Sequence, residues 1–435
     1  MRPIHVGIIG LGTVGTGTIR ILLENACVIE ARLGVPLKVK KIADIDLERD
    51  RDISLEREML TPHAADILRD PEIDIVVELI GGLEPAKSFI LQALNNGKHV
   101  VTANKALLAH HGEEVYRLAL ERSLDVGFEA SVGGGIPILR ALKEGFSANN
   151  VQAAYGIVNG TGNYILSKMA NEGRDFAQVL AEAQEKGYAE QDPSFDIEGI
   201  DSAHKLVILA SLAFGVPISL DRVYTEGIVR IGPIDIQHAC QLGYRIKLLA
   251  ITKRLGEEIE ARVHPTLIPQ ESPLANVNGV LNAIYVVGDA VGKNLFVGHG
   301  AGDMPTGSAV VGDIIEIARG ILKGQGGGRV PLLGFSLPGM KNVQIKEMSG
   351  LCLEYYLRFS VLDRPGVLSL ISGILGKHSI SIASVIQKEH GPGEAVPVVM
   401  MTHEAREQNI QEALFEIDRL EVVLDQTNLI RVERM

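Results

Sequence analysis

A glycine-rich turn near the N-terminus constrains the fold more than any other feature of the chain. The apolar run Ile4–Ile9 leads into Gly10-Leu11-Gly12-Thr13-Val14-Gly15, and helical spacing then covers Thr13–Leu23. A strand, a GxGxxG turn and a helix in this order are typical of a parallel sheet that binds a dinucleotide. The three glycines permit the tight turn, the approach of a pyrophosphate and close helix–sheet packing. A glycine turn that serves packing alone is the alternative.

Strand and helix patterns alternate over the first 150 residues. Strands are expected at Leu37–Ala43, Ile73–Ile80 and Lys98–Thr102, and a helix at Ser88–Asn95. This alternation favours a Rossmann-type doubly wound parallel sheet, which makes the fold class α/β. We expect residues 1–150 to form a dinucleotide-binding domain, completed by residues 300–322, where helical spacing covers Ser308–Arg319.

Three further parts follow this domain. Residues 151–299 predict an α+β catalytic and dimerisation domain, with strands at Gln152–Val158 and Ala261–Leu267 and helices at Phe176–Lys186, Ser202–Phe214 and Ile236–Thr252. Residues 323–348 are dense in glycine and proline and predict a linker. Residues 349–435 predict a βαββαβ (ferredoxin-like) unit, with strands at Tyr355–Val361, Ile380–Gln387, Ala395–Thr402 and Val422–Ile430 and helices at Val367–His378 and Glu404–Arg419.

The composition excludes several kinds of partner. A net charge of −12 argues against nucleic acid, because phosphate binding needs a concentrated basic surface. The chain lacks a run of about 18 uncharged apolar residues, so we expect no membrane helix. Cys27, Cys240 and Cys352 are far apart, and we expect them to be reduced thiols in the core. Together with an N-terminus that passes directly into a strand, this indicates a cytoplasmic protein.

Charged residues and glycines follow the expected strands, at the edge where parallel sheets bind ligands. Asp44 ends the second strand and would accept a hydrogen bond from a ribose 2′-hydroxyl, which favours NAD over NADP. Arg49 and Arg51 weaken that preference. Gly81 follows the third strand, and Lys105 follows the next. Lys105 is well placed to contact a substrate, and a solvated loop lysine is the alternative.

Carboxylates are concentrated before a single lysine between residues 183 and 205. The acids are Glu190, Asp192, Asp196, Glu198 and Asp201, and Lys205 follows them. The apolar run after Lys205 predicts a buried helix, with Asp201 and Lys205 on one face. The cluster suits a cationic ligand or acid–base chemistry, whereas the alternative is a surface ion pair worth about 0.3–0.5 kcal/mol. Asp192 precedes a proline, so it alternatively sets a turn.

These segments together resemble the homoserine dehydrogenase family over essentially all of residues 1–320. The most specific match is the spacing of Ala183, Gly187, Tyr188, Asp192, Pro193, Asp196, Gly199, Asp201 and Lys205. Residues 156–161, Asn163-Tyr164, residues 300–302 and Pro305-Thr306 also match. The resemblance implies NAD(P)-dependent interconversion of L-homoserine and L-aspartate 4-semialdehyde, on the route to threonine, methionine and isoleucine.

The resemblance also implies roles for individual residues. Lys205 is the general acid/base, Asp201 lies beside the reacting hydroxyl, and Lys105 holds the aldehyde oxygen or the substrate carboxylate. Glu190 binds the substrate's ammonium group, and Asp196 supports the acid–base network. The implied cofactor site comprises Gly10, Gly12, Thr13, Val14, Gly15, Asp44, Gly81, Lys105, Gly187 and Gly302.

A monovalent cation is implied by one further match. In the family, a loop like Phe128–Ile136 binds a cation such as Na⁺, and Glu129, Val132, Gly134 and Ile136 fit the pattern of its ligands. Hard cations prefer oxygen ligands, which a carboxylate and backbone carbonyls supply. The alternative is a tight glycine turn capped by Glu129.

The C-terminal unit resembles an ACT domain, a small-molecule sensor that often binds amino acids at dimer interfaces. The match rests on the βαββαβ order and on residues 363–368, DRPGVL, between its first strand and helix. Asp363 and Gly366 are then regulatory residues, threonine is the expected effector, and a homodimer or homotetramer is expected. The alternative is a turn that proline and glycine merely shape.

Two other functions would fit the same fold. A non-catalytic sensor would have lost Lys205 or the carboxylates near it, and both are present. Another amino-acid or semialdehyde dehydrogenase would keep the glycine turn but not the spacing of Asp201 and Lys205.

Overall fold

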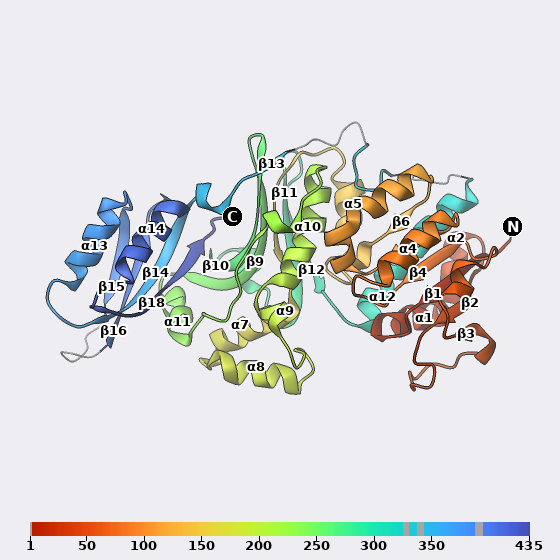
Figure 1. The fold of residues 1–435 in the computed structure, drawn as a ribbon, viewed down its shortest axis with the longest axis horizontal. Coiled ribbons are helices and arrows are strands. Elements are labelled where there is room, and N and C mark those ends of the chain that lie inside the picture. The colour runs from red at the N-terminus through yellow and green to blue at the C-terminus, as the bar shows by residue number, and fades with distance from the viewer. Residues whose placement is uncertain (1, 325–329, 337–342, 388–394) are drawn as a thin grey trace. The chain divides into compact units, whose positions relative to one another are not determined.

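The computed structural model describes residues 2–324, 330–336, 343–387 and 395–435, which form two units (Figure 1). The first unit comprises Met1–Ala154, His204–Asp221 and Asn282–Val343. The second comprises Tyr155–Ala203, Arg222–Leu281 and Gln344–Met435. Part of the expected linker, residues 325–329 and 337–342, lies outside the described residues.

A parallel sheet forms the centre of the first unit, as the strand–helix alternation predicts. Its order is β3-β2-β1-β4-β5-β6, and every adjacent pair is parallel. The strands are β1 (Ile4–Ile9), β2 (Leu37–Ala43), β3 (Leu60–Thr61), β4 (Ile75–Glu78), β5 (His99–Thr102) and β6 (Val126–Gly127). Every residue of β4 and β5 is buried, because helices cover both faces of the sheet. The predicted Rossmann-type fold is therefore confirmed.

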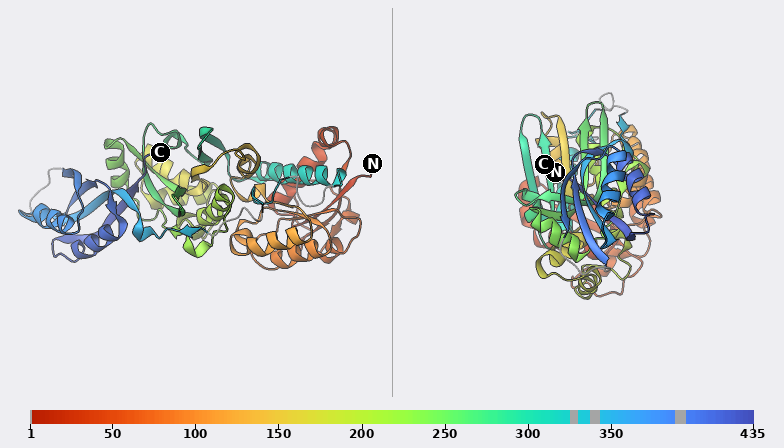
Figure 2. Two further views of the ribbon diagram at one scale, coloured as in Figure 1. Left: turned by 90° about the horizontal axis from the view of Figure 1, so that it is seen from above. Right: turned by 90° about the vertical axis from the view of Figure 1, so that its left-hand side faces the viewer.

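Helices on the two faces come from distant parts of the chain. Helices α1 (Thr13–Glu24) and α12 (Asp303–Leu322) lie on one face, and α4 (Ala86–Asn95) and α5 (Lys105–Glu121) lie on the other (Figure 2). Glycines permit the close contact of α1 with α12, since a Cβ at Gly17 would lie 2.3 Å from the oxygen of Asp303. The unit also contains α2 (Ala26–Leu33), α3 (Ala65–Leu68), α6 (Ile138–Arg140) and β12 (Gly292–His299).

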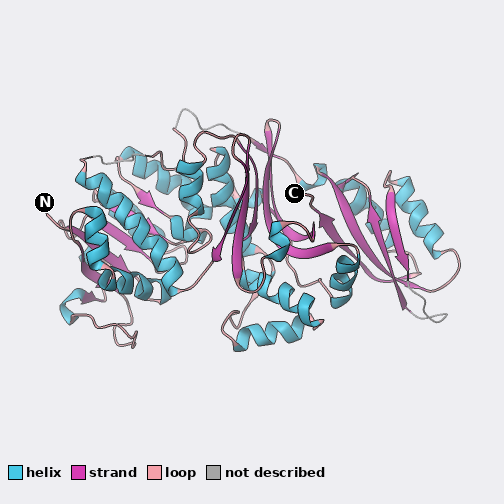
Figure 3. Ribbon diagram, turned by 180° about the vertical axis from the view of Figure 1, so that it is seen from behind, coloured by secondary structure: helices cyan, strands magenta, loops and turns pink. Residues whose placement is uncertain are grey.

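The second unit contains a long antiparallel strand pair, β9 (Tyr244–Leu255) and β10 (Glu258–Pro269), among the strands drawn in Figure 3. The predicted helix Ile236–Thr252 is wrong, because α11 (Pro233–Gln241) ends before Gly243 and β9 follows. Gly243 has a φ of +82°, which ends the helix. Seven successive residues of β9 are buried, so its apolar run shows no period-two pattern that would separate a strand from a helix.

The C-terminal part of the second unit has the predicted βαββαβ order. Its elements are β14 (Cys352–Leu362), α13 (Val367–Lys377), β15 (Ile382–Gln387), β16 (Ala395–Thr402), α14 (Glu407–Ile417) and β18 (Val423–Val432). The sheet runs β18-β14-β16-β15, and β14 pairs antiparallel with both of its neighbours. Apolar side chains of α13 and α14 pack with those of the sheet in one core. The strand order places the first and last strands side by side, as in a ferredoxin-like unit.

The structure also contains further helices and strands. They are β7 (Val151–Ile157), α7 (Gly160–Glu172), α8 (Phe176–Glu185), α9 (Ser194–Ile197), α10 (Ile200–Phe214), β8 (Tyr224–Thr225), β11 (Leu281–Gly288), β13 (Gln344–Ile345) and β17 (Ala405–Arg406). Helix α10 begins in the second unit and continues in the first. Among the described residues, no helix is long and apolar enough to cross a membrane. The cysteines are free, but the expectation that they lie in the core is wrong, since Cys27, Cys240 and Cys352 are exposed.

Candidate active site

The glycine turn has the geometry of a phosphate-binding loop. A Cβ at Gly10 would lie 2.7 Å from the carbonyl carbon of Leu79, and one at Gly15 would lie 2.2 Å from the oxygen of Gly10. Nothing lies within 4 Å of a Cβ at Gly12, so that side of the loop is open to a ligand. Gly12 precedes α1 without a side-chain cap, which leaves amide groups of the first turn for an anion.

Asp44 lies beside this loop, at the end of β2. Its carboxylate accepts hydrogen bonds from the backbone nitrogens of Leu11, at 2.5 Å, and Asp46, at 2.8 Å. The Arg51 guanidinium lies 3.4 Å from the same carboxylate and donates to the oxygen of Leu11 at 2.7 Å. Arg51 is thus fixed across the loop, with only 8% of its side chain exposed. Sequence reasoning named Arg51 as a nearby charge but missed its place in the site.

The ends of β4 and β5 are joined by a buried carboxylate. Glu78 accepts hydrogen bonds from the nitrogens of Ile80 and Gly81 and from the hydroxyl of Thr102, at 2.7 Å. Asn104 accepts from the nitrogen of Leu107 and caps α5, and its amide donates to the oxygen of Gly82. Lys105 is the first residue of α5 and half-buried, so it is not a solvated loop residue. No local pattern in the sequence marks the role of Glu78, because that role depends on strand pairing.

Asn159 joins two of the predicted carboxylates in the second unit. Its side-chain amide donates to Asp196 at 2.7 Å and to Asp201 at 2.9 Å. Its oxygen accepts from the nitrogen of Gly162 at 2.7 Å and caps α7. Asn159 was not among the predicted site residues, although the asparagine–glycine pair after β7 marks it as a helix cap. The amide donors separate two carboxylates that would otherwise repel each other.

Asp201 and Lys205 lie on the same helix, α10, four residues apart and so on one face. Asp201 is 2% exposed and Lys205 8% exposed, which contradicts the alternative of a surface ion pair. Lys205 belongs to the first unit, as does Lys105, whereas Glu190, Asp196 and Asp201 belong to the second.

The other residues of the acidic segment are more exposed. Glu190 is exposed, and its backbone oxygen accepts from Gln184 at 3.1 Å. Asp192 accepts from the nitrogen and hydroxyl of Ser194 at the start of α9, so it sets the turn, as its alternative role predicts. Gly187 has a φ of +72° just after α8.

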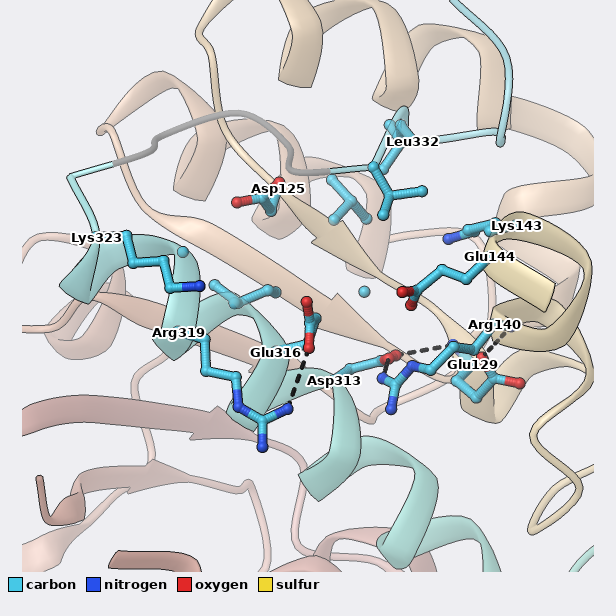
Figure 4. A pocket seen from close by; sticks show the side chains of 15 residues that line it. Asp125, Glu129, Arg140, Lys143, Glu144, Asp313, Glu316, Arg319, Lys323 and Leu332 are labelled. Atoms are coloured by element: carbon cyan, nitrogen blue, oxygen red, sulfur yellow. Dashed lines mark hydrogen bonds and ion pairs between the residues drawn. The ribbon is translucent and has the colours of Figure 1, made fainter. Parts of the chain in front are cut away.

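The predicted cation loop lies beside a pocket of about 370 Å³ (Figure 4). The Glu129 carboxylate accepts from the nitrogens of Leu139, at 2.8 Å, and Arg140, at 2.7 Å, rather than capping a glycine turn. Burial and the neighbouring Asp313 raise the pKa of Glu129 to about 7. A cation beside this carboxylate would favour its charged form. The donor types therefore fit a hard cation, although among the described residues no group of three His, Cys, Asp or Glu side chains is placed to hold a metal.

The predicted regulatory residues line one pocket of about 440 Å³ in the C-terminal domain. Asp363 and Gly366 lie in the turn before α13, together with Gln387 and Val398 from neighbouring strands. Gly366 has a φ of +95° at the start of that helix, which lacks a side-chain cap. A side chain there would be strained, so glycine shapes the turn.

The fold and the glycine loop define a dinucleotide-binding protein that carries a C-terminal ferredoxin-like domain. Comparison with models of known protein families identifies the family. The "Homoserine dehydrogenase" model matches residues 137–315, "Homoserine dehydrogenase, NAD binding domain" matches residues 10–129, and "ACT domain" matches residues 355–421. The chain belongs to the homoserine dehydrogenase family, as its sequence predicts.

Two relatives align along the whole chain, and a third aligns along most of it. A homoserine dehydrogenase of Pseudomonas aeruginosa is 47% identical over 439 residues and covers 100% of both chains. The crystal structure of a homoserine dehydrogenase from Thiobacillus denitrificans has a TM-score of 0.94 at 48% identity and covers 100% of this chain and 99% of that one. A hyperthermophilic archaeal homoserine dehydrogenase in complex with NADPH has a TM-score of 0.63 at 27% identity and covers 74% of this chain and 98% of that one.

Proposed function

We propose that the chain interconverts L-homoserine and L-aspartate 4-semialdehyde through Lys205, Asp201 and Lys105. The observation that carries the proposal is the buried Asn159–Asp196–Asp201 network, followed one helical turn later by a buried lysine. Oxidation of the alcohol needs a base for the hydroxyl proton, and reduction of the aldehyde needs an acid for the developing alkoxide. Lys205 exchanges that proton, and Asp201 orients the hydroxyl beside it. The nicotinamide cofactor supplies or accepts the hydride.

The substrate's charged groups have proposed partners in this chain. Both substrates carry an ammonium group and a carboxylate, and Glu190 and Asp196 supply negative charge for the ammonium group. Lys105, at the start of α5, binds the aldehyde oxygen or the substrate carboxylate. Asn159 holds Asp196 and Asp201 in place without adding charge, which supports their role in a preorganised site. The predicted residues Gly187 and Gly302 remain proposed cofactor contacts.

We propose that both NAD and NADP are used. Asp44 suits the 2′-hydroxyl of NAD, but Arg51 lies 3.4 Å from its carboxylate and offsets the charge that would repel a 2′-phosphate. The NADPH complex of the archaeal relative supports acceptance of the phosphorylated cofactor. A monovalent cation, Na⁺, is proposed to bind at Glu129 and the carbonyl oxygens of Val132, Gly134 and Ile136.

We also propose that threonine regulates the enzyme through the pocket lined by Asp363 and Gly366. The presence of an ACT domain supports a small-molecule effector. The proposed organisation is a dinucleotide-binding domain at 1–150 and 300–322, a catalytic domain at 151–299, a linker at 323–348 and a regulatory domain at 349–435. The enzyme is proposed to be cytoplasmic and to form a homodimer or homotetramer.

One experiment tests the central proposal. Purified protein is assayed for homoserine-dependent reduction of NAD and of NADP, with and without threonine. We expect turnover with both cofactors and a change in rate when threonine is added. No turnover with either cofactor would exclude the proposed reaction, whereas an unchanged rate with threonine would exclude only the proposed effector.

A further inference from the structure

We propose that Arg431, in the last strand of the C-terminal domain, is a positioning residue for the substrate-binding segment of the catalytic domain. Arg431 holds Tyr224 and Glu226, and these hold the backbone at Ile197–Gly199, between Asp196 and Asp201. The inference rests on the proposed roles of those two aspartates. We name Arg431, Glu407, Tyr224 and Glu226 the arginine clamp.

Arg431 is buried and links two parts of the second unit. Its Nε donates to Glu407 Oε2 at 3.0 Å, and its Nη2 donates to Glu407 Oε1 at 2.6 Å. Its Nη1 donates to Glu226 Oε2 at 2.7 Å, and Nη2 also donates to the Tyr224 hydroxyl at 3.0 Å. Arg431 and Glu407 are only 1% and 3% exposed. One guanidinium thus binds Glu407 of α14 in the C-terminal domain together with Tyr224 of β8 and Glu226 just after β8.

The clamp fixes the conformation of β8 and of the residue after it. The Tyr224 hydroxyl also donates to Glu226 Oε2 at 2.8 Å, so the two side chains and Arg431 form a closed triangle. β8 pairs with β10 at Arg262 and Val263, and the nitrogen of Glu226 donates to the oxygen of Val263 at 2.8 Å. Because both the backbone and the side chains are held, loss of Arg431 would release the side-chain half of this attachment.

Residues 226–228 lie directly on the substrate-binding segment. The nitrogen of Ile228 donates to the oxygen of Ile197 at 2.8 Å. A Cβ at Gly227 would lie 2.2 Å from that same oxygen, so the two backbones touch without intervening side chains. A Cβ at Gly199 would lie 3.3 Å from the oxygen of Glu226. A shift of Glu226 therefore moves the chain that carries Asp196 and Asp201.

Other contacts also hold the C-terminal domain to the rest of the second unit. β10 and β18 pair in parallel at Leu267 and Val432, and the nitrogen of Glu433 donates to the oxygen of Leu267 at 2.9 Å. A separate ion pair joins Arg358 of β14, which is partly exposed, to the buried Asp235 of α11, at 2.6 Å. Removal of the Arg431 side chain therefore leaves the domain attached. It removes the hydrogen bonds that Arg431 donates to Tyr224 and Glu226.

The structure also provides room for this segment to shift. A cleft of about 860 Å³ lies beside β8, and Tyr224, Glu226 and Arg431 line it together with residues of α14 and β18. Once the guanidinium is gone, the carboxylate of Glu226, whose side chain is already 33% exposed, loses its cation and is free to turn into this cleft. With the side chains of Tyr224 and Glu226 no longer fixed by Arg431, residues 226–228 are free to shift relative to Ile197.

The test compares Arg431→Met with Arg358→Met in the full-length protein. Both changes remove a guanidinium that pairs with a buried carboxylate, although the Arg358 side chain is 22% exposed, and the second change does not touch residues 224–228. We expect Arg431→Met to lower kcat/KM for homoserine about tenfold more than Arg358→Met does, since small displacements of reacting groups are costly. Cofactor affinity, measured by fluorescence titration, should stay within about twofold of the parent for both variants.

Two further variants keep the proposal falsifiable if Arg431→Met does not fold. Glu226→Gln keeps the size of the side chain and weakens the clamp, so it should reproduce the loss, and Arg431→Lys should restore part of it. The losses from Arg431→Met and Glu226→Gln should not add when the two are combined. An effect of Arg431→Met equal to that of Arg358→Met, or full additivity, would overturn the proposal. Asp201→Asn serves as the reference: if it leaves homoserine kinetics unchanged, the assigned substrate segment is wrong instead.

Discussion

Replacement of Asn159 by serine tests whether the two aspartates must be held in place. Asn159 is 6% exposed and donates to Asp196 and Asp201, while its oxygen caps α7 through the nitrogen of Gly162. Serine keeps an oxygen that can cap the helix but lacks the amide donors. The change therefore keeps the helix cap and removes the two hydrogen bonds that position the aspartates.

The expected loss follows from the two hydrogen bonds. A hydrogen bond to a charged group contributes about 1.5–3 kcal/mol, so two of them contribute about 3–6 kcal/mol. Water will replace part of this in the variant. If about 3 kcal/mol serves to hold the reactive geometry, kcat/KM for homoserine falls about 100-fold, at about 1.4 kcal/mol for each factor of ten. The helix cap is retained, so the loss in the free energy of unfolding is limited to what the two hydrogen bonds contribute and should stay below about 6 kcal/mol.

Initial rates of homoserine oxidation measure this loss, with cofactor affinity and thermal unfolding as controls. Asn159→Asp is the companion variant, because its carboxyl keeps the cap and faces the carboxylates of Asp196 and Asp201. Three carboxyl groups in one place will not all ionise, so the rate of this variant should rise relative to the parent as pH falls. The reasoning is refuted if Asn159→Ser retains kcat/KM within about threefold of the parent while folding normally.

Three other predictions concern separate parts of the molecule. Lys205→Ala should lower kcat by a factor of about 10²–10⁴ with cofactor binding preserved, and a near-normal rate would remove Lys205 from the acid–base role. Arg51→Ala should reduce kcat/KM with NADP about tenfold more than with NAD, because it exposes the charge of Asp44 to a 2′-phosphate, and equal losses would contradict this. Burial, with Arg262 and Arg431 nearby, holds the pKa of His264 well below its ordinary 6.5, so the unfolded chain binds this proton more tightly and stability falls as pH drops below about 6.5. Between about pH 7 and pH 5, the Tm of the His264→Asn variant should therefore fall less than the Tm of the parent. Equal falls in Tm would show that His264 does not contribute to the pH dependence of stability.

Features encoded by neighbouring residues were readable from the sequence. The strand, glycine turn and helix at the N-terminus predict the parallel sheet, since turn chemistry and hydrophobic periodicity act over a few residues. The same holds for Asp201 and Lys205, because a spacing of four on a helix places both side chains on one face. Periodicity failed at Tyr244–Leu255, where burial of successive residues removes the pattern that distinguishes a strand from a helix.

By itself, then, the sequence determined the family, the order of the domains and the candidate residues for catalysis. Only the tertiary structure decided which groups share a hydrogen-bond network: Asn159 with two aspartates about forty residues away, Arg51 on the carboxylate of Asp44, and Arg431 on Tyr224 and Glu226. The physical reason is that such contacts depend on how distant segments pack and on which polar groups that packing buries. A buried arginine near the end of the chain carries no local pattern that reveals its partners two hundred residues earlier.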